Sequence, residues 1–132
     1  MKNFVDEIRV GVSPRTTTPK FRAAYGRVFE KAYNSIRDHL KISDIKGAVI
    51  QARTGLRTVA SNGKPYDHLG EVQDAVNSIN TGLREAAKLW KQSWLSQGDR
   101  EALQAAQSYL QQAKNELQQI MTRDGAAGAI AW

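Results

Sequence analysis

Apolar residues recur every three or four positions along several stretches of the chain, which is the pattern of amphipathic helices. The first stretch begins at Thr18-Pro19, where threonine suits the N-cap and proline the first helical position, and it reaches about Leu40. Its apolar positions are Phe21, Tyr25, Val28, Ala32, Ile36 and Leu40. A shorter pattern starts at Ser43-Asp44 and stops at Gly55, so we expect a second, shorter helix there.

The two longest patterns lie in the second half of the chain. One runs from His68 to about residue 95, and the other follows the polar interruption at residues 96–99, where we expect Asp99 to cap the last helix. Long amphipathic helices joined by a short loop pack side by side in opposite directions. We therefore expect residues 68–95 and 99–121 to form an antiparallel pair, with the Phe21/Tyr25/Val28 face of the first helix lying across it.

The remaining segments lack a helical pattern. Residues 1–18 contain glycine, proline and consecutive threonines, and we expect them to form an N-terminal lead-in. Residues 57–66 include the turn signal Asn62-Gly63, which fits either a small hairpin or an irregular loop. The tail 125–132 is too rich in glycine to continue the last helix. The sequence thus predicts an all-α fold, with three to four main helices in a single domain over residues 19–132.

Composition excludes several classes of site. The chain has 132 residues, enough for one domain with its own core, and it contains no cysteine, so disulfides and thiolate metal sites are absent. No apolar run approaches the roughly 20 residues of a membrane span, and the N-terminus lacks the apolar region of a secretory signal. We expect no membrane insertion, no bound metal and no other cofactor.

Charge is distributed unevenly along the chain. Residues 1–64 hold 13 Lys and Arg against 5 Asp and Glu, whereas residues 65–132 hold 6 against 8. A basic half joined to a nearly neutral half favours a polyanionic partner, with nucleic acid first, although a solvated basic face has the same composition.

One segment combines several residue types that hydrolytic sites use. In Gly63–Val72, Asp67 suits the N-cap of the third predicted helix, and His68 and Glu71 then lie three residues apart on one side of its first turn. Lys64 and Tyr66 lie just before the cap, where free backbone N–H groups favour an anion. Ordinary helix capping and an ordinary surface histidine would explain the same residues.

The chain from Ile45 to about Leu110 resembles the bacterial polymorphic toxin type 28 domain. The resemblance rests chiefly on Gly63–Val72, which has the family's Gly-basic-Pro-aromatic-Asp-His-x-x-Glu-Val order, and on Gly82-Leu83 about ten residues later. It implies a helical toxin domain over residues 19–132 with ribonuclease activity. It also implies secretion or contact delivery, action in the target-cell cytoplasm, and a cognate immunity protein as partner.

The resemblance transfers catalytic roles by position to Asp67, His68 and Glu71. Imidazole suits acid and base steps near neutral pH, so we expect His68 to move a proton and Glu71 to orient it or act as its partner. If the first helix crosses the start of the third, His39 could approach His68 and supply the second proton transfer. The residues expected to bind RNA are Arg53, Arg57 and Lys64, which would neutralise phosphate, and Tyr66, which would stack on a base.

Two other functions remain open at this point. A metal-dependent nuclease would use Asp67, His68 and Glu71 as ligands, but three groups within one helical turn and without a distant fourth form a poor cage. A helical module without catalytic activity would bind nucleic acid or an acidic protein through the basic half, and His68 and Glu71 would then serve only the helix start.

Overall fold

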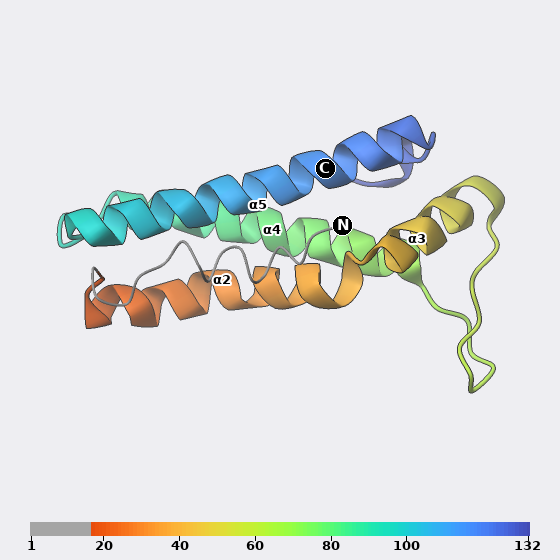
Figure 1. The fold of residues 1–132 in the computed structure, drawn as a ribbon, viewed down its shortest axis with the longest axis horizontal. Coiled ribbons are helices and arrows are strands. Elements are labelled where there is room, and N and C mark those ends of the chain that lie inside the picture. Colours follow the sequence, from red (N-terminus) through yellow and green to blue (C-terminus); the bar gives the residue numbers. More distant parts are fainter. Residues whose placement is uncertain (1–16) are drawn as a thin grey trace.

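The computed structural model describes residues 17–132, and this part of the chain is helical (Figure 1). The long helices are α2 (Pro19–His39), α3 (Ile42–Thr54), α4 (His68–Trp90) and α5 (Gln97–Arg123), and a short 3-10 helix, η2, covers Ala127–Ala129. The predicted all-α fold is confirmed, with no strand assigned within the described part. The expected lead-in lies outside the described residues up to position 16.

Helix α4 is the central element, because it packs against α2, α3 and α5. Helices α4 and α5 lie side by side in opposite directions, and α2 runs along the other side of α4 (Figure 1). Helix α3 crosses one end of this bundle beside the start of α4. The predicted antiparallel pair is therefore confirmed. No helix within residues 17–132 has both the length and the apolar composition that a membrane crossing requires.

The buried face of α2 differs in part from the predicted one. Phe21 is buried as expected and Tyr25 is half-buried, while the side chain of Val28 is outside the described ones. Phe29, which the predicted stripe omitted, is fully buried, and its ring centroid lies 4.8 Å from that of Tyr25 and 5.9 Å from that of Tyr33. Positions three and four after Tyr25 both suit the same helix face, so spacing alone did not distinguish them.

The starts of α2 and α5 are joined by one buried carboxylate. Thr18 caps α2 as predicted, since its side chain accepts a hydrogen bond from the N–H of Phe21. The N-cap of α5 is Ser96, not Asp99 as predicted, because the Ser96 hydroxyl accepts from the Asp99 N–H at 3.0 Å. Asp99 instead accepts from the Ser96 N–H and from both the N–H and the hydroxyl of Thr18. It is fully buried, so the carboxylate links two helix starts that lie far apart in sequence.

Helix α4 ends at Trp90, five residues before the predicted position. The guanidinium of Arg100 donates to the carbonyl oxygens of Trp90 and Gln92, and it lies 4.9 Å from the centroid of the Trp90 ring. These contacts satisfy the last carbonyl of α4 and one of the connection, without another helical turn. The apolar pattern continued to residue 95 because Leu95 is buried in the connection to α5.

A narrow loop separates α3 from α4. Helix α3 begins at Ile42, one residue before the predicted Ser43-Asp44 start, and ends as predicted at Gly55, whose φ of 74° is left-handed. Beyond it, Val59 pairs with Pro65 in an isolated antiparallel bridge, and Gly63 in the turn has φ 83°. Of the two expected alternatives the loop is thus hairpin-like, and it projects from the α3 end of the bundle (Figure 1).

The C-terminal segment folds back onto α4 and α5 after α5 ends at Arg123. Gln73 exchanges two hydrogen bonds with the backbone of Ala131, at 2.8 and 2.9 Å. Asn80 and Lys114 both donate to the carbonyl oxygen of Trp132 at 2.9 Å. The glycine-rich tail does not extend the helix, as expected, but it is held in place by side chains from two helices.

Candidate functional site

The start of α4 is held by Asp67 and by a glutamine from α3. The Asp67 carboxylate accepts hydrogen bonds from the amide of Gln51 at 2.8 Å and from the N–H of Gly70 at 3.1 Å. Gln51 also accepts from the N–H of Leu69, so one side chain contacts both the cap and the first helical turn. The Gln51 and Gly70 hydrogen bonds, aided by the positive charge of Arg57, hold the pKa of the Asp67 carboxyl below its usual value. Asp67 is therefore ionised at neutral pH and serves as the N-cap of α4.

The imidazole of His68 is packed between the hairpin loop and the backbone of α3. Its ring stacks on that of Tyr66, with centroids 4.9 Å apart and planes inclined by 21°. On α3 the ring meets Gly47, where a Cβ atom would lie only 2.3 Å from His68 Cδ2 and 3.1 Å from Nε2. No other residue type leaves this space, so the glycine that weakens α3 as a helix former lets the imidazole pack against it.

Two carboxylates from different helices face the other edge of the His68 ring. Its Nδ1 lies 3.6 Å from Oδ1 of Asp44 and 3.5 Å from Oε2 of Glu71. The Glu71 oxygen is also 3.3 Å from Nδ1 of His39, the last residue of α2. The exposed side-chain fraction is 11% for His68 but 39% for His39 and 33% for Glu71. The four residues, called here the His68 cluster, thus combine a sheltered imidazole with a more accessible one.

The sequence-predicted site residues divide into two groups in the structure. His68 and Glu71 contact each other in the cluster, while Asp67 turns its carboxylate to Gln51 and Gly70. The residues predicted to bind RNA all lie on the exposed surface at the end of α3 or on the loop that follows it, and they are Arg53, Arg57, Lys64 and Tyr66. Tyr66 reaches the cluster directly through its stack on His68.

Sequence analysis did not include Asp44, Gly47 or Gln51 in the site. These residues follow one another at steps of three and four along α3, so they share the helix face that meets the start of α4. The sequence signal that could have identified them is the combination of a carboxylate, a glycine and an amide on one face of a helix whose other face is apolar. The conditional expectation that His39 could approach His68 is matched by their shared contact with Glu71.

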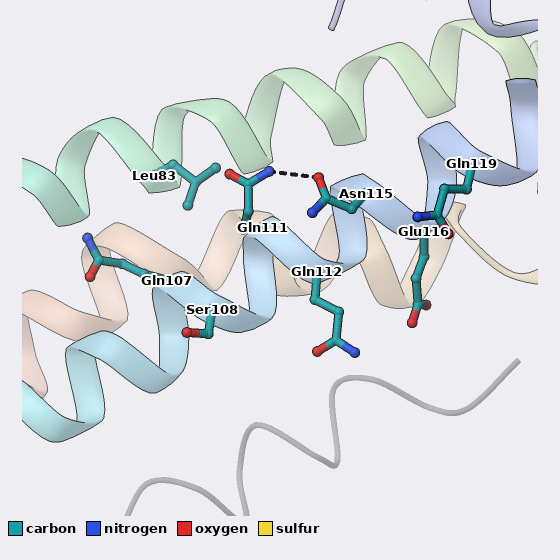
Figure 2. A pocket seen from close by; sticks show the side chains of 8 residues that line it. All are labelled: Leu83, Gln107, Ser108, Gln111, Gln112, Asn115, Glu116 and Gln119. Carbon is teal, nitrogen blue, oxygen red and sulfur yellow. Dashed lines mark hydrogen bonds between the residues drawn. The ribbon is translucent and has the colours of Figure 1, made fainter.

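A separate hollow lies along α5 and has a different character. Figure 2 shows that it is lined by Leu83 of α4 and by polar side chains of α5, with a hydrogen bond from the Gln111 amide to Asn115. None of its lining residues belongs to the His68 cluster, and none is a histidine. Its lining is mostly amides, with Glu116 as the one carboxylate and no imidazole beside it, so the cluster remains the better candidate for acid and base chemistry.

A protein-family model matches most of the chain. The family model described as bacterial toxin 28 matches residues 20–123, which extends beyond Ile45–Leu110 on both sides and includes α2 except for Pro19. All four residues of the His68 cluster fall within the matched range. No curated protein matches the chain, and no solved structure does.

Proposed function

The chain belongs to the bacterial toxin 28 family, and on that premise we propose that it is a toxin domain that cleaves RNA without a metal ion. The observation that supports this chemistry best is the shared contact of two imidazoles with one carboxylate. Oε2 of Glu71 lies 3.3 Å from Nδ1 of His39 and 3.5 Å from Nδ1 of His68. Two imidazoles, the side-chain type most often used for acid and base catalysis, therefore share one carboxylate.

The proposed reaction needs two proton transfers. One group removes the proton of a ribose 2′-hydroxyl, whose oxygen attacks the adjacent phosphorus, and another donates a proton to the departing 5′-oxygen. The products are a 2′,3′-cyclic phosphate and a free 5′-hydroxyl. We assign the two transfers to the imidazoles of His68 and His39, with Glu71 orienting both, because a positioned acid and base each contribute about 10²–10⁴ in rate. A second carboxylate oxygen, Oδ1 of Asp44, lies 3.6 Å from the same Nδ1 atom of His68.

Asp67 has a positioning role in this proposal. Its capping bonds with Gly70 and Gln51 hold the first turn of α4, which carries both His68 and Glu71. A cap of this kind contributes about 0.5–2 kcal/mol to stability. Replacing Asp67 by asparagine keeps an acceptor oxygen, so this variant should retain more activity than Asp67→Ala if the residue acts only through the helix start.

Substrate binding is proposed for the exposed basic residues at the end of α3 and on the hairpin-like loop. Arg53, Arg57 and Lys64 can approach phosphates because their side chains are exposed. Tyr66 is 44% exposed and already stacks one ring face on His68. A base stacked on the other face would bring its ribose close to the His68 cluster.

The family assignment also supports a delivery route and a partner. We propose that the domain is secreted or contact-delivered by the producing cell and acts on RNA in the cytoplasm of the target cell. In the producing cell, a cognate immunity protein would inhibit it. The gene should then be lethal when expressed alone and tolerated when expressed together with the neighbouring gene for the immunity protein. A helical module that only binds nucleic acid would not need such protection.

Purified protein and a defined RNA test the chemistry directly. Cleavage should persist in EDTA and leave 2′,3′-cyclic phosphate ends, and it should fall by about 10²–10⁴ in His68→Ala and in His39→Ala. Glu71→Gln should slow cleavage less than His68→Ala if Glu71 only orients the imidazoles. Asp74→Asn is its matched control, because Asp74 is an exposed carboxylate three residues further along α4. A His68→Ala protein that folds and still cuts RNA at the original rate would refute the assignment. Binding of RNA without cleavage would favour the non-catalytic module.

A further inference from the structure

The His68 cluster contains three atoms placed as metal ligands are placed. One oxygen of Asp44, one ring nitrogen of His68 and one oxygen of Glu71 all lie within 4.8 Å of one another. The Nδ1 atom of His68 is 3.6 Å from the Asp44 oxygen and 3.5 Å from the Glu71 oxygen. These residues come from α3 and from the first turn of α4, so the packing of two helices assembles the set.

The nitrogen of His68 is itself unusual. The residue is only 9% exposed, and its buried Nδ1 has no hydrogen-bond partner within the described part of the chain. Buried polar atoms are nearly always hydrogen-bonded, so an exception needs a physical explanation. Nδ1 faces two carboxylate oxygens that lie at or just beyond hydrogen-bonding distance, and these oxygens attract either a proton or a metal cation on the nitrogen.

Two of the three separations in this set agree with a tetrahedral ion. Zinc forms bonds of about 2.0–2.2 Å to imidazole nitrogen and carboxylate oxygen, which places neighbouring tetrahedral ligands about 3.3–3.6 Å apart. The two separations from Nδ1 of His68 are 3.5 and 3.6 Å. One nitrogen and two oxygens suit Zn²⁺ better than Mg²⁺ or Ca²⁺, which prefer oxygen ligands alone.

We propose that Asp44, His68 and Glu71 form a Zn²⁺ site and that the bound ion inhibits the nuclease. The ion would bind Nδ1 of His68 and the carboxylate of Glu71, so it would break the contact through which Glu71 orients the imidazoles in the proposed chemistry. The fourth ligand position is left to water. The binding half of this proposal depends only on the geometry of the three residues, whereas the inhibition half rests on the proposed ribonuclease function. Metal-free cleavage and zinc inhibition are compatible, because both depend on the same atoms.

Cobalt(II) titration of the full chain tests the binding half without any activity assay. Tetrahedral Co²⁺ absorbs visible light far more strongly than hydrated Co²⁺, and added Zn²⁺ should displace it. We expect one ion per chain in the original protein and in Asp74→Asn. We expect no tetrahedral spectrum in His68→Ala. The Asp44→Asn variant should bind more weakly by at least the roughly 10–100-fold that losing an outer-shell partner costs. Circular dichroism should verify that each variant is folded.

Zinc added to the RNA-cleavage assay tests the inhibition half. Cleavage should fall as the site fills and return after EDTA is added. The proposal is overturned if the original protein gives no tetrahedral spectrum, or if folded Asp44→Asn and His68→Ala bind Co²⁺ as tightly as the original protein. It is also overturned if filling the site with Zn²⁺ leaves cleavage unchanged. If no condition gives RNA cleavage, the proposed function fails while the cobalt titration still decides whether the ion site exists. Cleavage that requires zinc would support the ion site but overturn both inhibition and the metal-free route.

Discussion

Replacement of Gly47 by alanine tests whether the position of the His68 ring controls activity. The new Cβ would lie 2.3 Å from His68 Cδ2 and 3.0 Å from Cγ. Ordinary van der Waals contact starts at 3.4 Å, so the ring or the α3 backbone must move by about 1.1 Å. A displacement of this size costs about 10²-fold in rate when it affects a reacting group. The shift would also disturb the His68 contacts with Asp44 and Glu71.

The stability change should be small by comparison. Alanine is favoured over glycine within a helix by about 1 kcal/mol, while overpacking costs about 1–3 kcal/mol. The two effects oppose each other, so we expect a net loss of no more than about 2 kcal/mol. Activity should therefore fall much more than stability. Steady-state cleavage of a defined RNA and thermal unfolding, measured on the same preparation, separate the two quantities.

Gly26 provides the matched control for this experiment. It lies within α2, and a Cβ added there would have nothing within 4 Å. Gly26→Ala should raise stability by up to about 1 kcal/mol and leave cleavage unchanged. The reasoning fails if Gly47→Ala is folded and cleaves RNA at the original rate. It also fails if Gly26→Ala loses as much activity as Gly47→Ala.

Three further predictions concern stability, RNA binding and the helix start. Asp99→Ala should lower the free energy of unfolding by about 1–3 kcal/mol in urea, because it leaves the half-buried Thr18 and Ser96 donors unpaired. Burial raises the pKa of the Asp99 carboxyl, but the Ser96 and Thr18 hydrogen bonds outweigh it and hold that pKa below 3.8. Its contribution should thus be complete above pH 3.8 and disappear as pH falls through the folded pKa, which acid titration of the original protein and the variant would reveal. The double variant Arg53→Glu/Arg57→Glu should bind RNA more weakly, with a shallower dependence on salt and an unchanged helical spectrum; equal affinity would show that these residues do not contact phosphate. Gln51→Ala should slow cleavage while its thermal midpoint falls only modestly. An unchanged rate would show that the hydrogen bonds of Gln51 to Asp67 and Leu69 are not needed for activity.

Local sequence determined where several helices start or end. Thr18-Pro19 begins α2 because the threonine hydroxyl and the proline ring suit the first turn whatever packs around it. Gly55 ends α3 because glycine adopts the left-handed conformation easily. The spacing of His68 and Glu71 likewise places them on one side of the first turn of α4, and they do contact each other. These features depend on neighbours within about one helical turn, so the sequence alone can predict them.

Tertiary packing decided which distant residues joined that first turn. Asp44 and Gly47 reach His68 because α3 packs against α4, and His39 reaches Glu71 because α2 ends beside the same turn. Asp99 changed from a predicted helix cap into a buried link because α2 brings Thr18 to it. Periodicity identifies the apolar face of each helix, but the register between two faces is set by how their buried side chains interlock. That register depends on residues far apart in the chain, and only the folded structure reveals it.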